Sequence, residues 1–177
     1  MSTIKVGDIN IYYEVHGEGE PLLLIAGLGG DLTAWMFQTP EFSKKYRVIV
    51  FDNRGVGRSD TPDIPYSTEM MADDTAGLMN ALSIEKAHVL GQSMGGAIAQ
   101  ELALKYLQRV KSLILADTEA RPYSLCNYVM NAWVKMRQED VSLETFIRNQ
   151  LPWLFTDKFF ENPEQVQTMI DTMLANP

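Results

Sequence analysis

The sequence has 177 residues, of which 46% are hydrophobic, so it is long enough to bury a core but too short for two large domains. Its formal net charge of −8 argues against a nucleic acid or an anionic membrane surface as a partner, because both select basic patches. No apolar stretch reaches membrane-spanning length, and residues 1–8 lack the basic-then-apolar form of a signal peptide. We therefore expect a cytoplasmic protein whose partner is a small neutral or apolar molecule.

The chain opens with strand patterns. Apolar residues nearly alternate over residues 4–6 and 9–15, and the Gly7-Asp8 pair between them predicts a β-hairpin. Residues 21–26 form a continuous apolar run, which predicts a strand of the main sheet. That strand leads into a glycine-rich loop at residues 27–30, whose glycine spacing matches neither of the common nucleotide-binding motifs.

Helix and strand patterns alternate after this loop. Ser67 or Thr68 is placed to cap a helix that extends to about Leu82, because apolar side chains recur there at helical spacing. Strand and helix alternation predicts a mostly parallel sheet with its functional site at the carboxyl ends of the strands. The other expected elements are a helical stretch at residues 32–42, strands at 46–51, 87–91 and 110–116, and a helix from 94 to about 106.

The pentapeptide Gly-Gln-Ser-Met-Gly at residues 91–95 connects an expected strand to an expected helix, which is the setting of a nucleophile elbow. In such a turn the serine, here Ser93, adopts a strained backbone conformation. The residues two before and two after it approach so closely that only very small side chains fit. The main-chain amide of Met94 and the positive end of the following helix would face an oxygen that gains negative charge during acyl transfer.

Three segments together resemble the α/β-hydrolase family: the elbow, the glycine-rich loop, and the turn Asp-Asn-Arg-Gly-Val-Gly-Arg-Ser at residues 52–59. The resemblance runs from Ile4 to about Ala120. It implies an α/β fold with a mostly parallel sheet and flanking helices. It further implies a six-stranded hydrolase core at residues 1–121 and an incomplete helical cap segment at residues 122–177.

The same resemblance implies roles for particular groups. Ser93 would be the nucleophile of a serine hydrolase that acts on a small ester, lactone or related activated carbonyl. The main-chain amides of Leu28 and Met94 would form the oxyanion hole, and no metal or cofactor would take part. In the turn, Asp52 and Arg54 are expected to form an internal pair that holds the loop's shape, without a catalytic role.

Other reactions share a serine elbow and stay open at this point. They are carbon–carbon bond hydrolysis, acyl transfer and cofactor-free haloperoxidation. Relatives that cleave epoxides or carbon–halogen bonds carry aspartate in place of Ser93, which argues against those reactions. A non-catalytic protein that keeps the fold and binds a ligand or a partner is the alternative from a different class.

A serine nucleophile needs a base, usually a histidine that a carboxylate orients. The family places both downstream of the serine, yet none of residues 94–177 is histidine. His16 and His88 both precede Ser93 and are expected to be structural. Asp117 ends an expected strand and is a candidate acid, although we prefer a loop or helix-cap role for it. We therefore expect the chain to be the front portion of a longer hydrolase, inactive or incomplete by itself.

The pattern changes to amphipathic helices after Thr118, with helices expected near residues 128–136, 143–151 and 163–174. We expect the aromatic residues of this region to be ordinary helix-packing residues more often than the lining of an acyl pocket.

The strand at residues 110–116 would be the last of the sheet. It would leave an exposed apolar edge, which favours pairing with a second copy. We therefore expect a homodimer through this edge or through the cap.

Overall fold

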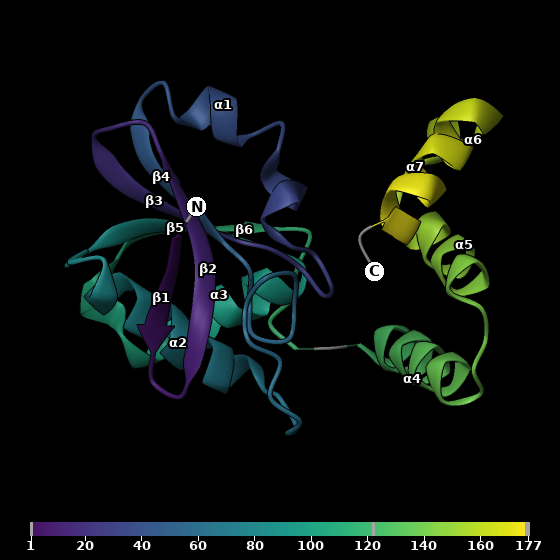
Figure 1. Ribbon diagram of the computed structural model, residues 1–177, viewed down its shortest axis with the longest axis horizontal. Coiled ribbons are helices and arrows are strands. Elements are labelled where there is room, and N and C mark those ends of the chain that lie inside the picture. Colours follow the sequence, from purple (N-terminus) through teal and green to yellow (C-terminus); the bar gives the residue numbers. More distant parts are fainter. Residues whose placement is uncertain (1, 122, 176–177) are drawn as a thin grey trace. The chain divides into compact units, whose positions relative to one another are not determined.

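The computed structural model describes residues 2–121 and 123–175. The chain divides into two compact units, residues 1–121 and 122–177; the boundary residue Pro122 lies outside the described residues. In the first unit six strands form one sheet in the order β1-β2-β4-β3-β5-β6 (Figure 1). The strands are β1 (Ser2–Val6), β2 (Ile9–His16), β3 (Glu20–Ile25), β4 (Tyr46–Phe51), β5 (Ala87–Gln92) and β6 (Val110–Ala116).

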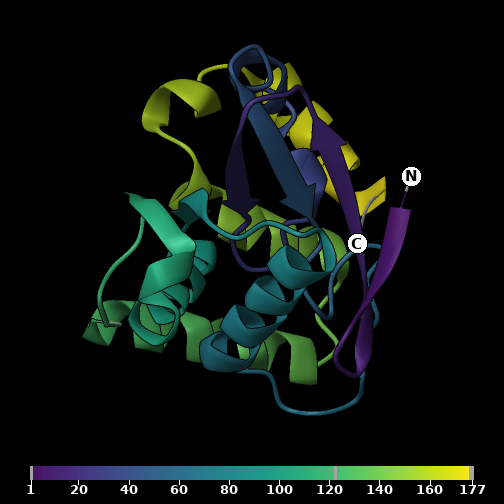
Figure 2. The same cartoon turned by 90° about the vertical axis from the view of Figure 1, so that its left-hand side faces the viewer.

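The sheet is mostly parallel, as the alternation of strands and helices predicts. β1 and β2 form the expected antiparallel hairpin and lie side by side at one edge (Figure 1, Figure 2). β2 also pairs antiparallel with β4, whereas β3 pairs parallel with β4 and β5, and β5 pairs parallel with β6. The carboxyl ends of β3, β4, β5 and β6 therefore meet at the same end of the sheet.

Helices cover both faces of this sheet (Figure 1). The helices of the first unit are η1 (Leu32–Trp35), α1 (Thr39–Phe42), α2 (Thr68–Ala81), α3 (Met94–Lys105) and η2 (Leu107–Arg109). On one face, α2 and α3 pack on the larger hydrophobic core, which includes the fully buried Leu23, Ile49 and Ile98. On the other face, the short helices η1 and α1 cover a smaller core around Leu24 and Val50.

The helix boundaries follow local capping chemistry. The Ser67 hydroxyl accepts a hydrogen bond from the Met70 amide over 3.1 Å, so α2 begins where the capping residue predicts. The single helical stretch expected at residues 32–42 is wrong in detail, because the chain there forms two short helices. Asp31 caps the first of them, and Pro40 lies in the first turn of the second, where a missing amide hydrogen is tolerated.

β6 is an edge strand, as expected for the last strand of the sheet. Its apolar sequence is typical of a strand buried on both faces, but only Val110 of β6 is buried. Ile114 and Leu115 each keep 45% of their surface exposed. The difference arises because burial depends on neighbours in the sheet, which the composition of a strand does not specify.

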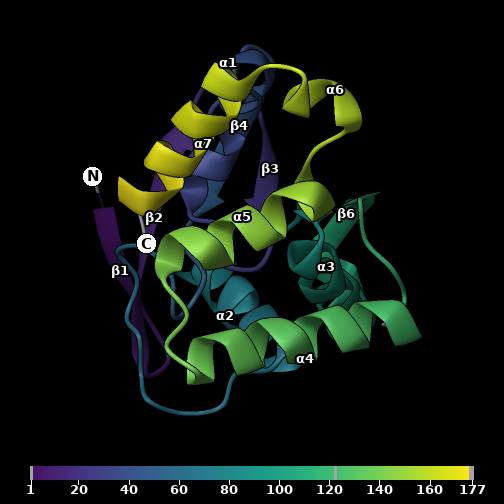
Figure 3. The same ribbon diagram turned by 90° about the vertical axis from the view of Figure 1, so that its right-hand side faces the viewer.

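Over its described residues, 123–175, the second unit forms four helices, α4 (Ser124–Gln138), α5 (Leu143–Leu154), α6 (Asp157–Phe160) and α7 (Pro163–Ala175). α5 lies between α4 and α7 (Figure 3). The small hydrophobic core of the second unit is formed by Ile147, Leu151 and Ile170. The Trp133 indole donates a hydrogen bond to the Asn149 side chain over 2.8 Å, which links α4 to α5. Three of these helices are expected from the sequence, and α6 is not. Over residues 2–121 and 123–175, no helix is long and apolar enough to cross a membrane.

Candidate active site

Ser93 occupies the turn between β5 and α3, at the carboxyl end of the sheet. Its backbone has φ 53° and ψ −121°, a combination that L-residues rarely adopt and that costs on the order of 1–3 kcal/mol. Ser93 is the N-cap residue of α3, but its side chain makes no capping hydrogen bond. The hydroxyl is therefore not used to stabilise the helix, although serine commonly has that role at an N-cap.

Two glycines make this turn sterically possible. A Cβ atom on Gly91 would lie 2.2 Å from the carbonyl oxygen of Gly95. A Cβ atom on Gly95 would lie 2.1 Å from the carbonyl oxygen of Ile25 in β3. Real Cβ atoms do not approach main-chain atoms this closely, so both positions require glycine, as the elbow motif predicts.

The loop after β3 lies against the elbow. A Cβ atom on Gly27 would lie 3.2 Å from the Ser93 Cβ and 2.7 Å from the Gln92 side-chain oxygen. The Asn53 side chain donates a hydrogen bond to the Ala26 carbonyl over 3.3 Å, which holds the start of this loop. Leu28 follows Gly27 directly, and its side chain is 62% exposed.

Met94 is the first residue of α3, which spans 12 residues. The first amides of a helix have no partner within the helix, and they carry the positive end of its dipole. The amide of Met94 is one of these. Its side chain packs on the larger core, so the start of the helix is anchored to the sheet.

Asp117 directly follows β6 and is exposed. Its φ of 49° lies in the left-handed region, which aspartate tolerates better than most residues. Its carboxylate lies 3.5 Å from the Gln92 side-chain amide, so it stands beside the elbow. Asp117 is not a helix cap, because Tyr123 is the N-cap residue of α4. Of the two structural roles considered from the sequence, only the loop role fits.

Both histidines lie at the other end of the sheet. His16 pairs with Val48 near the start of β4. His88 contacts the Ser112 hydroxyl at 2.6 Å and the Glu20 carboxylate at 3.0 Å. Ser93 lies five positions after His88 along an extended chain, which is roughly 16 Å at the usual rise of a strand. Neither ring is therefore placed to accept a proton from Ser93.

The turn at residues 52–59 is structural, and its internal ion pair joins Asp52 to Arg58 over 3.8 Å, not to Arg54. Asp52 is fully buried and accepts hydrogen bonds from the amides of Leu32 and Arg58 at 2.8 and 2.9 Å. Arg54 instead binds Asp74 of α2 through two hydrogen bonds of 2.5 and 2.7 Å. The hydrogen bonds to Asp74 raise the pKa of Arg54, so its guanidinium stays charged in the interior. The expected internal pair of Asp52 with Arg54 is wrong, because the partner of Arg54 lies on a different element.

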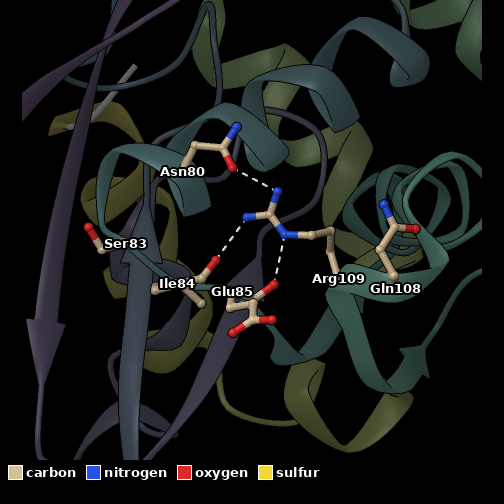
Figure 4. A pocket seen from close by; sticks show the side chains of 6 residues that line it. All are labelled: Asn80, Ser83, Ile84, Glu85, Gln108 and Arg109. Atoms are coloured by element: carbon tan, nitrogen blue, oxygen red, sulfur yellow. Dashed lines mark hydrogen bonds between the residues drawn. The ribbon is translucent and has the colours of Figure 1, made fainter.

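A surface hollow of about 550 Å³ lies beside Arg109, away from the elbow (Figure 4). The Arg109 guanidinium donates hydrogen bonds to the carbonyls of Ile84 and Glu85 and to the Asn80 side chain, at 2.7–2.8 Å. These bonds join η2 to the end of α2 and the loop that follows it, so we assign Arg109 a structural role. Within the part of the chain that the structure describes, no group of three His, Cys, Asp or Glu side chains could hold a metal ion.

Comparisons with known sequences agree with this arrangement. The sequence model of the family described as alpha/beta hydrolase fold matches residues 20–169. The protein RutD of Azorhizobium caulinodans is 43% identical over 115 residues, which are 65% of this chain and 43% of that protein. The chain therefore spans less than half of the length of this relative.

Solved structures extend the similarity to nearly the whole chain. A thermophilic esterase from Thermogutta terrifontis superposes with a TM-score of 0.85 at 35% identity, covering 98% of this chain and 66% of that one. The enol-lactonase from Burkholderia xenovorans LB400 superposes with a TM-score of 0.84 at 33% identity, covering 96% of this chain and 65% of that one.

Proposed function

The chain belongs to the alpha/beta hydrolase fold family, and on this premise we propose that it is the nucleophile-bearing part of a serine hydrolase. In this proposal Ser93 attacks the carbonyl carbon of a small ester or lactone with an apolar or neutral acyl group. The observation that carries the proposal is the backbone of Ser93, which keeps a strained conformation while its hydroxyl caps no helix. Such strain persists where function requires a side chain at one position.

The chemistry follows in two steps. The Ser93 oxygen forms a bond to the carbonyl carbon and gives its proton to a base, and the tetrahedral intermediate then expels the alcohol to leave an acyl-enzyme. Water, activated by the same base, later hydrolyses this acyl-enzyme. The amides of Met94 and Leu28 stabilise the oxyanion. The start of α3 supports Met94 in this role, and the contact of Gly27 with the elbow supports Leu28.

The base and its carboxylate come from outside these 177 residues in this proposal. Two observations support this part of the proposal. His16 and His88 lie far from Ser93, and the match to RutD covers only 43% of that protein. Asp117 is the local alternative for the carboxylate, because it stands beside Gln92 at the elbow.

Ester and lactone substrates are the first choice among acyl compounds, since an esterase and an enol-lactonase are among the similar structures. The net charge of −8 disfavours strongly anionic substrates.

Turnover of neutral p-nitrophenyl esters and γ-lactones by the protein made from its complete coding sequence tests the proposal. We expect hydrolysis of one of these classes and its loss in Ser93→Ala. Equal rates for the wild type and Ser93→Ala would exclude Ser93 as the nucleophile.

A non-catalytic ligand-binding protein is the second candidate. The position of both histidines at the far end of the sheet favours it. It predicts that neutral esters bind without turnover and that Ser93→Ala leaves their affinity unchanged.

A further inference from the structure

We propose that Thr118 is a positioning residue for Ser93. Its hydroxyl, together with the carbonyl of Ala116, holds the strained backbone of Ser93 in the conformation that presents the serine side chain. The catalytic consequence rests on the proposed function, whereas the structural claim stands on the contacts alone.

Both main-chain polar groups of Ser93 bind the same short segment after β6. The Ser93 amide donates a hydrogen bond to the Ala116 carbonyl over 3.0 Å. The Ser93 carbonyl accepts one from the Thr118 hydroxyl over 2.8 Å. The peptide groups on either side of the Ser93 Cα are therefore fixed by residues 116 and 118, and these groups define φ and ψ of Ser93.

Asp117 lies between the two groups that contact Ser93. In a parallel ladder, a residue donates its amide to the carbonyl of one residue of the neighbouring strand, and its carbonyl accepts from the residue two positions further on. Ala116 and Thr118 have this spacing, and the Thr118 hydroxyl supplies the second hydrogen bond. Asp117 between them has the left-handed φ of 49°.

The Thr118 hydroxyl is not needed merely to satisfy the Ser93 carbonyl. That carbonyl already accepts hydrogen bonds from the amides of Gly96 at 2.9 Å and Ala97 at 3.3 Å. Those two bonds begin α3 and would remain without the threonine. The bond from Thr118 comes from outside the helix, so it constrains the direction in which the Ser93 peptide points.

The fit around Thr118 is close. A Cβ atom on Gly96 would lie 2.4 Å from the Thr118 methyl carbon and 2.6 Å from its hydroxyl oxygen. The absence of a side chain at residue 96 therefore lets Thr118 reach the Ser93 carbonyl. The contact fixes the threonine rotamer as well, because the side chain has little space in which to turn.

Two variants separate the hydroxyl from the shape of the side chain. Thr118→Val keeps the branched shape but removes the donor, and Thr118→Ser keeps the donor but removes the methyl group. We would record, in the ¹⁵N-labelled protein made from its complete coding sequence, the exchange rate of the Ser93 amide and its three-bond coupling between the amide and α protons, which reports φ. We would also record the rate of Ser93 modification by a fluorophosphonate.

The expected result is a change in Thr118→Val only. The Ser93 amide should exchange roughly two- to tenfold faster, the range that corresponds to one lost hydrogen bond, and its coupling should move from the wild-type value. Fluorophosphonate modification should slow in the same variant, and Thr118→Ser should match the wild type in all three measurements.

The inference is overturned if Thr118→Val leaves the exchange and the coupling of Ser93 unchanged, or if Thr118→Ser changes them equally. A failure of the proposed function has a different signature. In that case no protein reacts with the fluorophosphonate, the wild type included, while the two spectroscopic measurements still decide the role of Thr118.

Discussion

Gly91 and Gly95 face each other so closely across the elbow that a Cβ on Gly91 would stand 2.2 Å from the Gly95 carbonyl oxygen. Because the obstructing atom belongs to the main chain, no side-chain rotation could relieve the overlap. The sharp turn that presents Ser93 therefore depends on Gly91, and it depends on Gly95 as well because a Cβ there would stand 2.1 Å from the Ile25 carbonyl oxygen. This dependence, and not the frequency of glycine in turns, explains the spacing of the motif.

Gly91→Ala should lower the free energy of unfolding by about 3 kcal/mol or more, because the backbone must shift to admit the methyl group. Gly30→Ala is the matched control, since the nearest atom to a Cβ there lies at an ordinary 3.5 Å. That control should stay within about 0.5 kcal/mol of the wild type. Urea denaturation measures both, and equal effects of the two substitutions would refute the steric argument.

Replacing Ser93 should reveal the cost of its backbone conformation. Ser93→Gly and Ser93→Ala both remove the hydroxyl, but only glycine adopts φ 53° without strain. We expect Ser93→Gly to be more stable than Ser93→Ala by about 1 kcal/mol, after the greater freedom of glycine in the unfolded chain is subtracted. Thermal and urea denaturation of the two variants test this. A more stable Ser93→Ala would mean that the elbow is not strained.

Breaking the buried ion pair of Arg54 with Asp74 should lower the free energy of unfolding more than most surface substitutions do. Arg54 and Asp74 have 3% and 9% of their side-chain surface exposed, so loss of one partner leaves a buried charge; without Asp74, the Arg54 guanidinium keeps only the exposed Asp8 carboxylate at 3.4 Å. We expect Asp74→Leu or Arg54→Met to destabilise the protein by about 3–5 kcal/mol. The double variant Arg54→Met/Asp74→Leu should recover part of this loss. A double variant as unstable as the sum of the single ones would show that charge burial is not the cause.

The stability of the first unit should depend on pH through Asp73. Hydrogen bonds from Lys105, and secondarily from Tyr106, hold the pKa of Asp73 below its usual 3.8. The folded state therefore favours the ionised carboxylate, and this contribution is present above pH 3.8 and is lost as the pH falls through the lower, folded value.

The measurement is the difference in unfolding free energy between the wild type and Asp73→Asn at pH 7 and pH 3. The difference should shrink at pH 3, whereas the exposed Asp63→Asn control should show a smaller pH-dependent change. If the difference grows at pH 3, ionised Asp73 does not stabilise the folded state and the prediction is wrong.

We propose that the edge of β6 mediates self-association, which the sequence predicts. Its outer main-chain groups have no strand beside them in the described sheet, and Ile114 and Leu115 are each 45% exposed. We expect dimers of the 177-residue chain by light scattering at micromolar concentration, and monomers after Ile114→Lys. A stable wild-type monomer would contradict this proposal.

The parts of the fold that could be predicted from the sequence are mostly those set by residues close together in the chain. The strand at residues 46–51 has the predicted ends, and α2 begins after Ser67, because hydrophobic runs and capping residues act over a few positions. α6 was not expected, since its four residues are too few to show a helical period.

In the candidate site, too, contacts between residues far apart in the sequence could not be predicted. Gly91 could be predicted because its constraint is local, whereas the atom that would obstruct a Cβ on Gly95 is the Ile25 carbonyl oxygen of another strand, and only the motif points to it. The partner of Arg54 could not, because Asp74 lies 20 residues away on another element and only the packed fold brings the two together. The contact of Thr118 with Ser93 spans 25 residues and likewise has no local signal.

The central claim is that the Ser93 hydroxyl is a nucleophile, and active-site labelling tests it most directly. The protein made from its complete coding sequence is treated with a fluorophosphonate, digested and examined by mass spectrometry. The account predicts a single adduct on the peptide that contains Ser93, absent from Ser93→Ala. An adduct on another residue, or no adduct at Ser93 in the wild type, would contradict it.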